Sequence, residues 1–65
     1  MKIDGLKVYT ILKKQEKTQG KLSEAVGISR NTINGIINGR ATTKETAEKI
    51  AAALGVRLEE ITEKN

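Results

Sequence analysis

This chain contains neither Cys nor His, so neither a disulfide nor a tetrahedral zinc site can support its fold. Those are the usual supports of very small domains. At 65 residues, the chain lies near the lower size limit for folding without them. Its stability must therefore come from close packing of secondary structure, and we expect one domain spanning residues 1–65.

The absence of Cys and His also limits the classes of function that the chain can have. Without Cys or His, most nucleophilic, general-base and metal chemistry is excluded. One Asp accompanies seven Glu, and no spacing pairs them into an acid–base site. We therefore expect no enzyme, no catalytic residue, no metal, no cofactor and no small-molecule ligand.

Basic residues are concentrated in the first part of the chain. Residues 1–40 contain eight Lys or Arg and three acids, a balance of +5, whereas residues 41–65 contain four and five, a balance of −1. This asymmetry indicates a surface that faces a polyanion, or else an unevenly charged solvated surface. No apolar run is long enough for a signal peptide or a membrane span. We expect a cytoplasmic protein that does not bind membranes.

Helical spacing and end signals predict an all-α fold of five short helices. Residues 5–16 favour the first helix, although the run from Val8 to Ile11 also has strand propensity. Thr18 offers an N-cap for the second helix, which Gly27 would end in a left-handed conformation.

The remaining helices have weaker boundaries. Ser29 would cap a third helix running to about residue 38. The fourth could be capped by Thr42, in a capping box with Glu45, or by Thr43. A short fifth helix would start at Arg57, which is not a good cap.

Residues 27–42, GISRNTINGIINGRAT, combine helical apolar spacing with a loop-like composition. Ile33, Ile36 and Ile37 fall on one side of a helix, and the opposite side carries Asn31, Asn34, Gly35 and Asn38, with Arg30 and Thr32 on the flanks. An ordinary solvated face would favour Lys, Glu, Gln or Ala, which stabilise helices better than Asn. Asn can bond an adenine edge, and Arg a guanine edge, in two places. This face therefore predicts contact with DNA bases.

The turn VGIS at residues 26–29 joins the second and third helices. The pattern around it is Gln19, Leu22, small Ser23, Gly27, Ile28, Ile33 and Ile36. This order resembles the helix-turn-helix of the phage-repressor and Cro-like family, also called the XRE family. The segments TQ, GISRNTI and NGRATTKETAEKIAAALGV resemble that family's second-helix start, recognition helix and fourth helix. The resemblance covers nearly the whole chain and implies a lambda-repressor-like DNA-binding domain.

Three positions depart from the family pattern. Glu16-Lys17 stands where members often have Gly-Leu, and Ser23 replaces the usual Ala. Gly35 lies where members often carry a base-contacting side chain. Its missing side chain would let the backbone approach the DNA groove closely.

The resemblance and the helical face together imply a recognition helix at about residues 29–38 in the major groove. Base contacts are expected from Arg30, Asn31 and Asn34. Base or backbone contacts are expected from Gln19, Ser29, Thr32, Gly35 and Asn38. Phosphate contacts are expected from Thr18, Arg40, Thr43 and Lys44.

The leading hypothesis is a sequence-specific transcriptional regulator of double-stranded DNA, most simply a repressor that occludes a promoter. An alternative is a protein-interaction module, such as an antitoxin-like partner, on the same helical scaffold. We expect DNA binding instead, because no partner-binding extension follows the fifth helix. RNA binding is a weaker alternative, since the single aromatic residue, Tyr9, leaves stacking platforms missing.

One recognition helix reads only a few base pairs, too few to select one site in a genome. Family members pair on two half-sites about one helical turn, roughly 34–36 Å, apart. We therefore expect an inverted-repeat operator and a weak homodimer that forms mainly on DNA. Leu58 and Ile61, in the less basic half, are the expected pairing residues.

Overall fold

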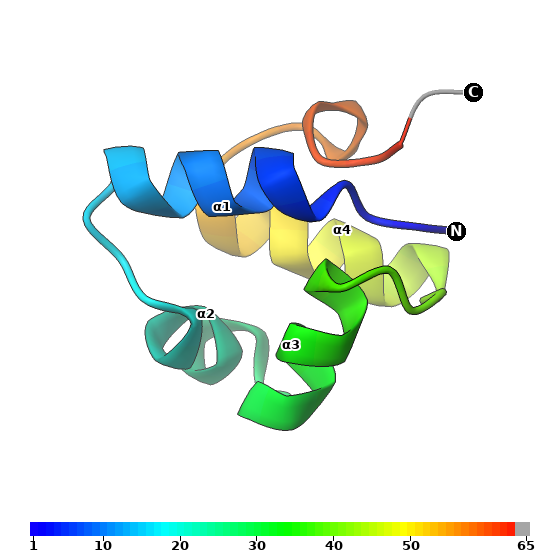
Figure 1. Ribbon diagram of the computed structural model, residues 1–65, viewed down its shortest axis with the longest axis horizontal. Coiled ribbons are helices and arrows are strands. Elements are labelled where there is room, and N and C mark those ends of the chain that lie inside the picture. Colours follow the sequence, from blue (N-terminus) through cyan, green and yellow to red (C-terminus); the bar gives the residue numbers. More distant parts are fainter. Residues whose placement is uncertain (64–65) are drawn as a thin grey trace.

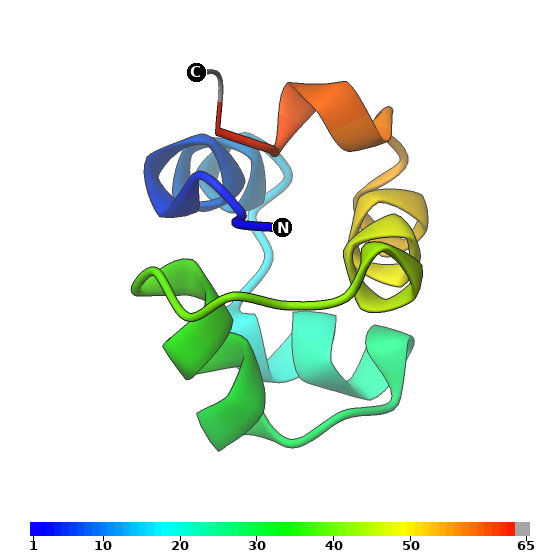
Figure 2. The same ribbon diagram turned by 90° about the vertical axis from the view of Figure 1, so that its right-hand side faces the viewer.

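The computed structural model describes residues 1–63, which contain four α-helices, one 3₁₀ helix and one isolated bridge between extended residues. The elements are α1 (Gly5–Lys14), α2 (Gln19–Val26), α3 (Arg30–Ile37), α4 (Lys44–Leu54) and the 3₁₀ helix η1 (Leu58–Glu60). α1 and α4 stand between η1 at one end of the molecule and the α2–α3 pair at the other (Figures 1 and 2). The all-α prediction is confirmed, with the fifth helix reduced to a 3₁₀ turn.

Polar side chains start the first three helices. Thr18 and Ser29 cap α2 and α3 as predicted, each accepting the backbone N–H three residues further on, at 3.2 and 3.1 Å. The cap of α1 is Asp4, whose carboxylate accepts the N–H groups of Leu6 and Lys7 at 3.1 and 3.3 Å. These caps fix where each helix begins, and so fix the length of each connection.

The fourth helix is capped by Thr43, whose hydroxyl accepts the backbone N–H of Thr46 at 3.2 Å. The alternative of a capping box between Thr42 and Glu45 is wrong. The N–H of Thr42 instead donates to the carbonyl of Met1 at 2.7 Å, which ties the loop after α3 to the start of the chain.

The first helix ends two residues earlier than the range 5–16 suggests, because Glu16 adopts a left-handed backbone conformation with φ of 55°. This turn lets the N–H of Lys17 donate to the carbonyl of Leu12 at 2.9 Å. Glu16 thus occupies a conformation that glycine adopts without strain, at the position where the resembling family often has glycine.

The two ends of the described chain lie together at one corner of the molecule (Figure 1). Ile3 forms an antiparallel bridge with Thr62, and the N–H of Asp4 donates to the carbonyl of Ile61 at 2.7 Å. The side chains of Ile3 and Ile61 are buried, with 1% and 0% exposed. Ile61 is therefore a core residue, and the expectation that it pairs with a second chain is wrong.

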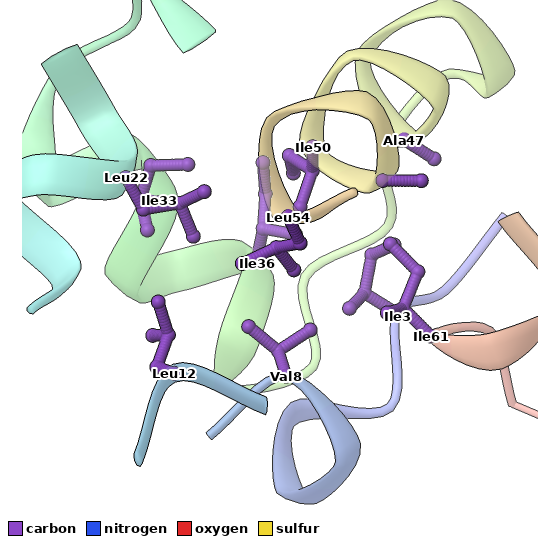
Figure 3. Close-up of a cluster of buried hydrophobic side chains, with 11 residues drawn as sticks. Ile3, Val8, Leu12, Leu22, Ile33, Ile36, Ala47, Ile50, Leu54 and Ile61 are labelled. Carbon is purple, nitrogen blue, oxygen red and sulfur yellow. The ribbon is translucent and has the colours of Figure 1, made fainter. Parts of the chain in front are cut away.

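A single cluster of aliphatic side chains joins all parts of the fold (Figure 3). Its buried members are Ile3, Val8, Leu12, Leu22, Ile33, Ile36, Ala47, Ile50, Ala51, Leu54 and Ile61. Leu6 and Tyr9 lie outside it, 75% and 50% exposed, so the apolar residues of α1 are not all core. The isoleucines of α3 pack into this cluster, so the opposite side of that helix lies outside the core.

The last helix is a single 3₁₀ turn. Its weak start at Arg57 is stabilised from within, because the Glu60 carboxylate accepts the Arg57 N–H at 2.8 Å. None of the helices within residues 1–63 has both the length and the apolar character needed to cross a bilayer.

Candidate nucleic-acid interface

The turn between α2 and α3 has the geometry that its sequence predicts. Gly27 is left-handed, with φ of 83°, and its N–H donates to the carbonyl of Ser23 at 2.8 Å. The Ser23 side chain is buried, and its hydroxyl donates to the carbonyl of Gly20 at 2.8 Å, so its polar atom is satisfied. Ile28 packs against the core from inside the bend. The angle between the two helices is thereby fixed by packing.

The two sides of α3 differ as the helical spacing predicts. Ile33 and Ile36 are buried, with 0% and 2% exposed. The opposite side, here called the asparagine face, consists of Asn31, Asn34, Gly35 and Asn38, of which the three asparagines are exposed and Gly35 is half-buried. The weak helix formers therefore lie on the outside of the domain, where they can meet a ligand.

Hydrogen bonds already engage part of the polar surface of α3. The hydroxyls of Ser29 and Thr32 lie 2.8 Å apart, beside the capping bond of Ser29 to the Thr32 N–H. The Asn38 amide donates to the side-chain carbonyl of Asn34 at 3.3 Å. These bonds orient the side chains and leave the Asn31 side chain and the amide nitrogen of Asn34 without a hydrogen-bond partner among residues 1–63.

Arg30 connects the two helices of the motif at their amino ends. A β-carbon built on Gly20 would lie 3.7 Å from the Thr18 hydroxyl and 3.9 Å from the Arg30 Nε, so both groups border the first turn of α2. Gln19, the first residue of α2, is half-buried beside them. The amino end of α2 thus brings a hydroxyl and an amide together beside free backbone N–H groups, a combination that suits a phosphate, while the Arg30 guanidinium borders this site on the side of α3.

Arg40 occupies the space above Gly35. A β-carbon on Gly35 would meet the guanidinium at 3.5 Å from Nε, 3.6 Å from Cζ and 3.7 Å from Nη1. The backbone brings the two residues together, since the Arg40 N–H donates to the Gly35 carbonyl at 2.9 Å. The sequence predicts bare backbone at Gly35, whereas the structure covers it with a guanidinium.

The loop after α3 runs from that helix to the start of α4 and crosses the middle of the molecule (Figure 2). Thr43 and Lys44 are exposed at its far end. The Thr43 hydroxyl is used for capping and also lies 3.0 Å from that of Thr46, so Lys44 is the freer of the two to meet a phosphate.

The two adjacent acidic residues of the chain lie far from the α2–α3 end of the molecule. Glu59 and Glu60 lie in η1, at the opposite end of the molecule from α2 and α3 (Figure 2). The ion pairs found within residues 1–63, Glu45–Lys49 and Arg57–Glu59, involve neither Arg30 nor Arg40. Both guanidiniums near α3 are therefore available to an anionic or polar ligand.

Comparison with known proteins identifies this arrangement. A family model described as helix-turn-helix matches residues 8–61. The chain belongs to this helix-turn-helix family. The resemblance to the phage-repressor and Cro-like (XRE) proteins is thereby confirmed, and with it a DNA-binding domain built around α2 and α3.

One curated relative of this helix-turn-helix chain is the antitoxin HigA-1 of Vibrio cholerae serotype O1 (strain ATCC 39315 / El Tor Inaba N16961). The two are 50% identical over 38 residues, which is 58% of this chain and 36% of the relative. The match thus spans about a third of the relative's length.

Sequence reasoning missed the contacts that depend on residues distant along the chain or on side-chain direction. The covering of Gly35 by Arg40 and the approach of Arg30 to Gly20 belong to this class. The sequence did contain one signal for the contact between Arg40 and Gly35. A glycine stands on the helix face expected to contact DNA, and a long basic residue follows it five positions later.

Proposed function

We propose that this chain is a transcriptional regulator that binds a specific double-stranded DNA sequence through α3 in the major groove, and that it represses by occluding a promoter. The observation that carries this proposal is the asparagine face. Its residues weaken the helix, they lie outside the core, and their amides match the edge of adenine. A face with no ligand would gain helix stability from Lys, Glu or Gln in place of these asparagines.

The surrounding groups support a division of roles. Asn31, Asn34 and Arg30 are proposed to contact bases, while Thr18 and Lys44 hold the phosphates on either side of the groove. Gln19, Ser29, Thr32 and Asn38 would orient these contacts or add to them. Phosphate contacts position the helix, and the base contacts give the sequence preference.

We further propose that two copies bind an inverted repeat with half-sites about one helical turn apart, roughly 34–36 Å. One α3 offers few base-reading side chains, which is too little to select a single genomic site. With Ile61 buried, Leu58 is the partly exposed apolar residue of η1 that remains for pairing. The free chain is expected to be monomeric at micromolar concentration.

Selection of bound sequences from a random duplex pool tests these proposals together. An enriched motif containing an inverted repeat is the expected result. A motif with one half-site, bound by one chain, would exclude the dimer and keep the specific DNA binding. A pool without any enriched motif would refute the proposed function.

A second candidate is a protein-interaction role of the antitoxin kind, favoured because the relative is an antitoxin. The same selection separates the two, because a chain that serves only as a scaffold for a protein partner would enrich no sequence. Any binding of such a chain to duplex DNA would be non-specific and would fall steeply as the salt concentration rises.

A further inference from the structure

We propose that Arg40 reads a base pair and acts as the side chain that Gly35 lacks. This inference rests on the proposed function, since it requires α3 to lie in the major groove. The sequence pattern alone places Arg40 among the phosphate contacts, which position a protein without reading sequence. Its position in the fold supports a different role.

The guanidinium presents its flat side to the position that a β-carbon of residue 35 would take. Three of its atoms, Nε, Cζ and Nη1, are at nearly equal distances of 3.5, 3.6 and 3.7 Å from the point where a β-carbon would stand. The direction that a side chain would take from this helical position is therefore filled by the side chain of Arg40. Its planar edge, with the N–H donors, remains available around the helix surface.

The location of Gly35 decides which part of DNA the guanidinium meets. At 100° per residue, Gly35 falls about 40° from Asn31 and about 160° from the buried Ile33, so it lies nearly opposite that core residue. When such a helix enters the major groove, the residues opposite its buried side face the base edges. Arg40 thus reaches the part of α3 that is directed at bases, although its own backbone lies beyond the helix.

The backbone holds Arg40 in this place. Its N–H donates to the Gly35 carbonyl at 2.9 Å, after a left-handed Gly39 with φ of 107° turns the chain back. Two residues later, the N–H of Thr42 is fixed to Met1. A long side chain anchored at both sides of its backbone loses less freedom on binding than one on an open loop.

A small residue at position 35 is what makes the overlay possible. A methyl group there would stand in ordinary van der Waals contact with the guanidinium, so Ala leaves Arg40 in place. A bulky side chain such as Leu would place further atoms around the β-carbon, in competition with the guanidinium for this space. The guanidinium fork matches guanine O6 and N7, which a lysine ammonium cannot bond in the same bidentate way.

The test compares protein variants on every single-base variant of the selected DNA site. Lys44→Ala is the matched control, because it also removes one positive charge, at the residue where the loop meets α4. Arg40→Ala is expected to abolish discrimination at one base pair, a loss of roughly 5- to 150-fold in preference. Arg40→Lys should retain most affinity at low salt and lose the same discrimination. Lys44→Ala should weaken binding to all base variants equally.

A charge-neutral variant checks the geometry. Gly35→Leu should lose preference at the same base pair as Arg40→Ala, while Gly35→Ala keeps it, with helix content by circular dichroism confirming the fold. If Arg40→Ala weakens all base variants equally, as Lys44→Ala does, Arg40 is a phosphate contact, and the proposed function stands without this inference. The inference also fails if Gly35→Leu keeps the preference. A wild-type chain without base preference would overturn both.

Discussion

Gly5 and Gly35 are both helical glycines, yet their surroundings are opposite. A β-carbon at Gly5, the first residue of α1, would collide with the backbone carbonyl of Ile37 at the end of α3. At Gly35 the nearest atom would be 3.5 Å away and belongs to a flexible side chain. One glycine is therefore required for the packing of α1 on α3, whereas the other could carry a β-carbon without a collision.

We expect Gly5→Ala to lower the free energy of unfolding by about 1–3 kcal/mol, because the backbone of one helix must move away from the other. Gly35→Ala is the matched control and should raise it by up to about 1 kcal/mol through helix propensity. Urea unfolding of both variants measures the difference. A Gly5→Ala variant as stable as the wild type would contradict the close approach of α1 to α3.

The second prediction at the residue scale concerns the base preference that Asn31 and Asn34 provide. Each Ala substitution should relax the base preference at one or two neighbouring base pairs, by about 1–3 kcal/mol, since a bidentate amide contact is lost. Both residues are exposed, so folding should be unaffected. The affinities of both proteins for single-base variants of the selected DNA site measure this preference. If neither substitution changes it, the asparagine face does not read DNA bases.

At the scale of elements, the connection from α1 to α2 carries a measurable strain. Glu16 has a φ of 55°, a left-handed conformation that costs an L-residue roughly 1–2 kcal/mol. Glu16→Gly should therefore raise the free energy of unfolding by about 1 kcal/mol, after allowance for the greater freedom of glycine in the unfolded chain. Glu24→Gly, in the exposed interior of α2, is the control and should lower it. Urea unfolding measures both variants, and a Glu16→Gly variant less stable than the wild type would contradict the strain.

The elements also show how far sequence reasoning reaches. The caps Thr18 and Ser29, the left-handed Gly27 and the split faces of α3 all follow from local rules, because each depends on residues within one turn. The pairing of Ile3 with Thr62 does not, since the two residues meet only after the helices between them have packed. The overlay of Arg40 on Gly35 is hidden for a different reason, because the two residues are close in sequence but the direction of the long Arg40 side chain does not follow from local rules.

For the whole molecule, the expected property is a steep salt dependence of DNA affinity. Each neutralised phosphate contributes a log–log slope of roughly −0.9. Lys44→Ala should flatten that slope by about one phosphate, whereas Arg57→Ala should leave it unchanged, because Arg57 precedes η1 at the other end of the molecule and pairs with Glu59 at 3.7 Å. Binding titrations of both variants over a range of salt concentrations measure the two slopes. A DNA affinity that does not change with salt would contradict the proposal that the α2–α3 end of the molecule contacts phosphates.

The bridge between Ile3 and Thr62, near the two ends of residues 1–63, gives this part of the chain nearly the topology of a closed ring. The Glu63 N–H also donates to the Lys2 carbonyl at 3.2 Å, so a short peptide link could join the ends without crossing the core. Such a ring could be reopened between α1 and α2 to give a circular permutant with the same helices in a new order. The helix-turn-helix and the loop bearing Arg40 would then remain one uninterrupted segment, with the recognition surface independent of where the polypeptide starts.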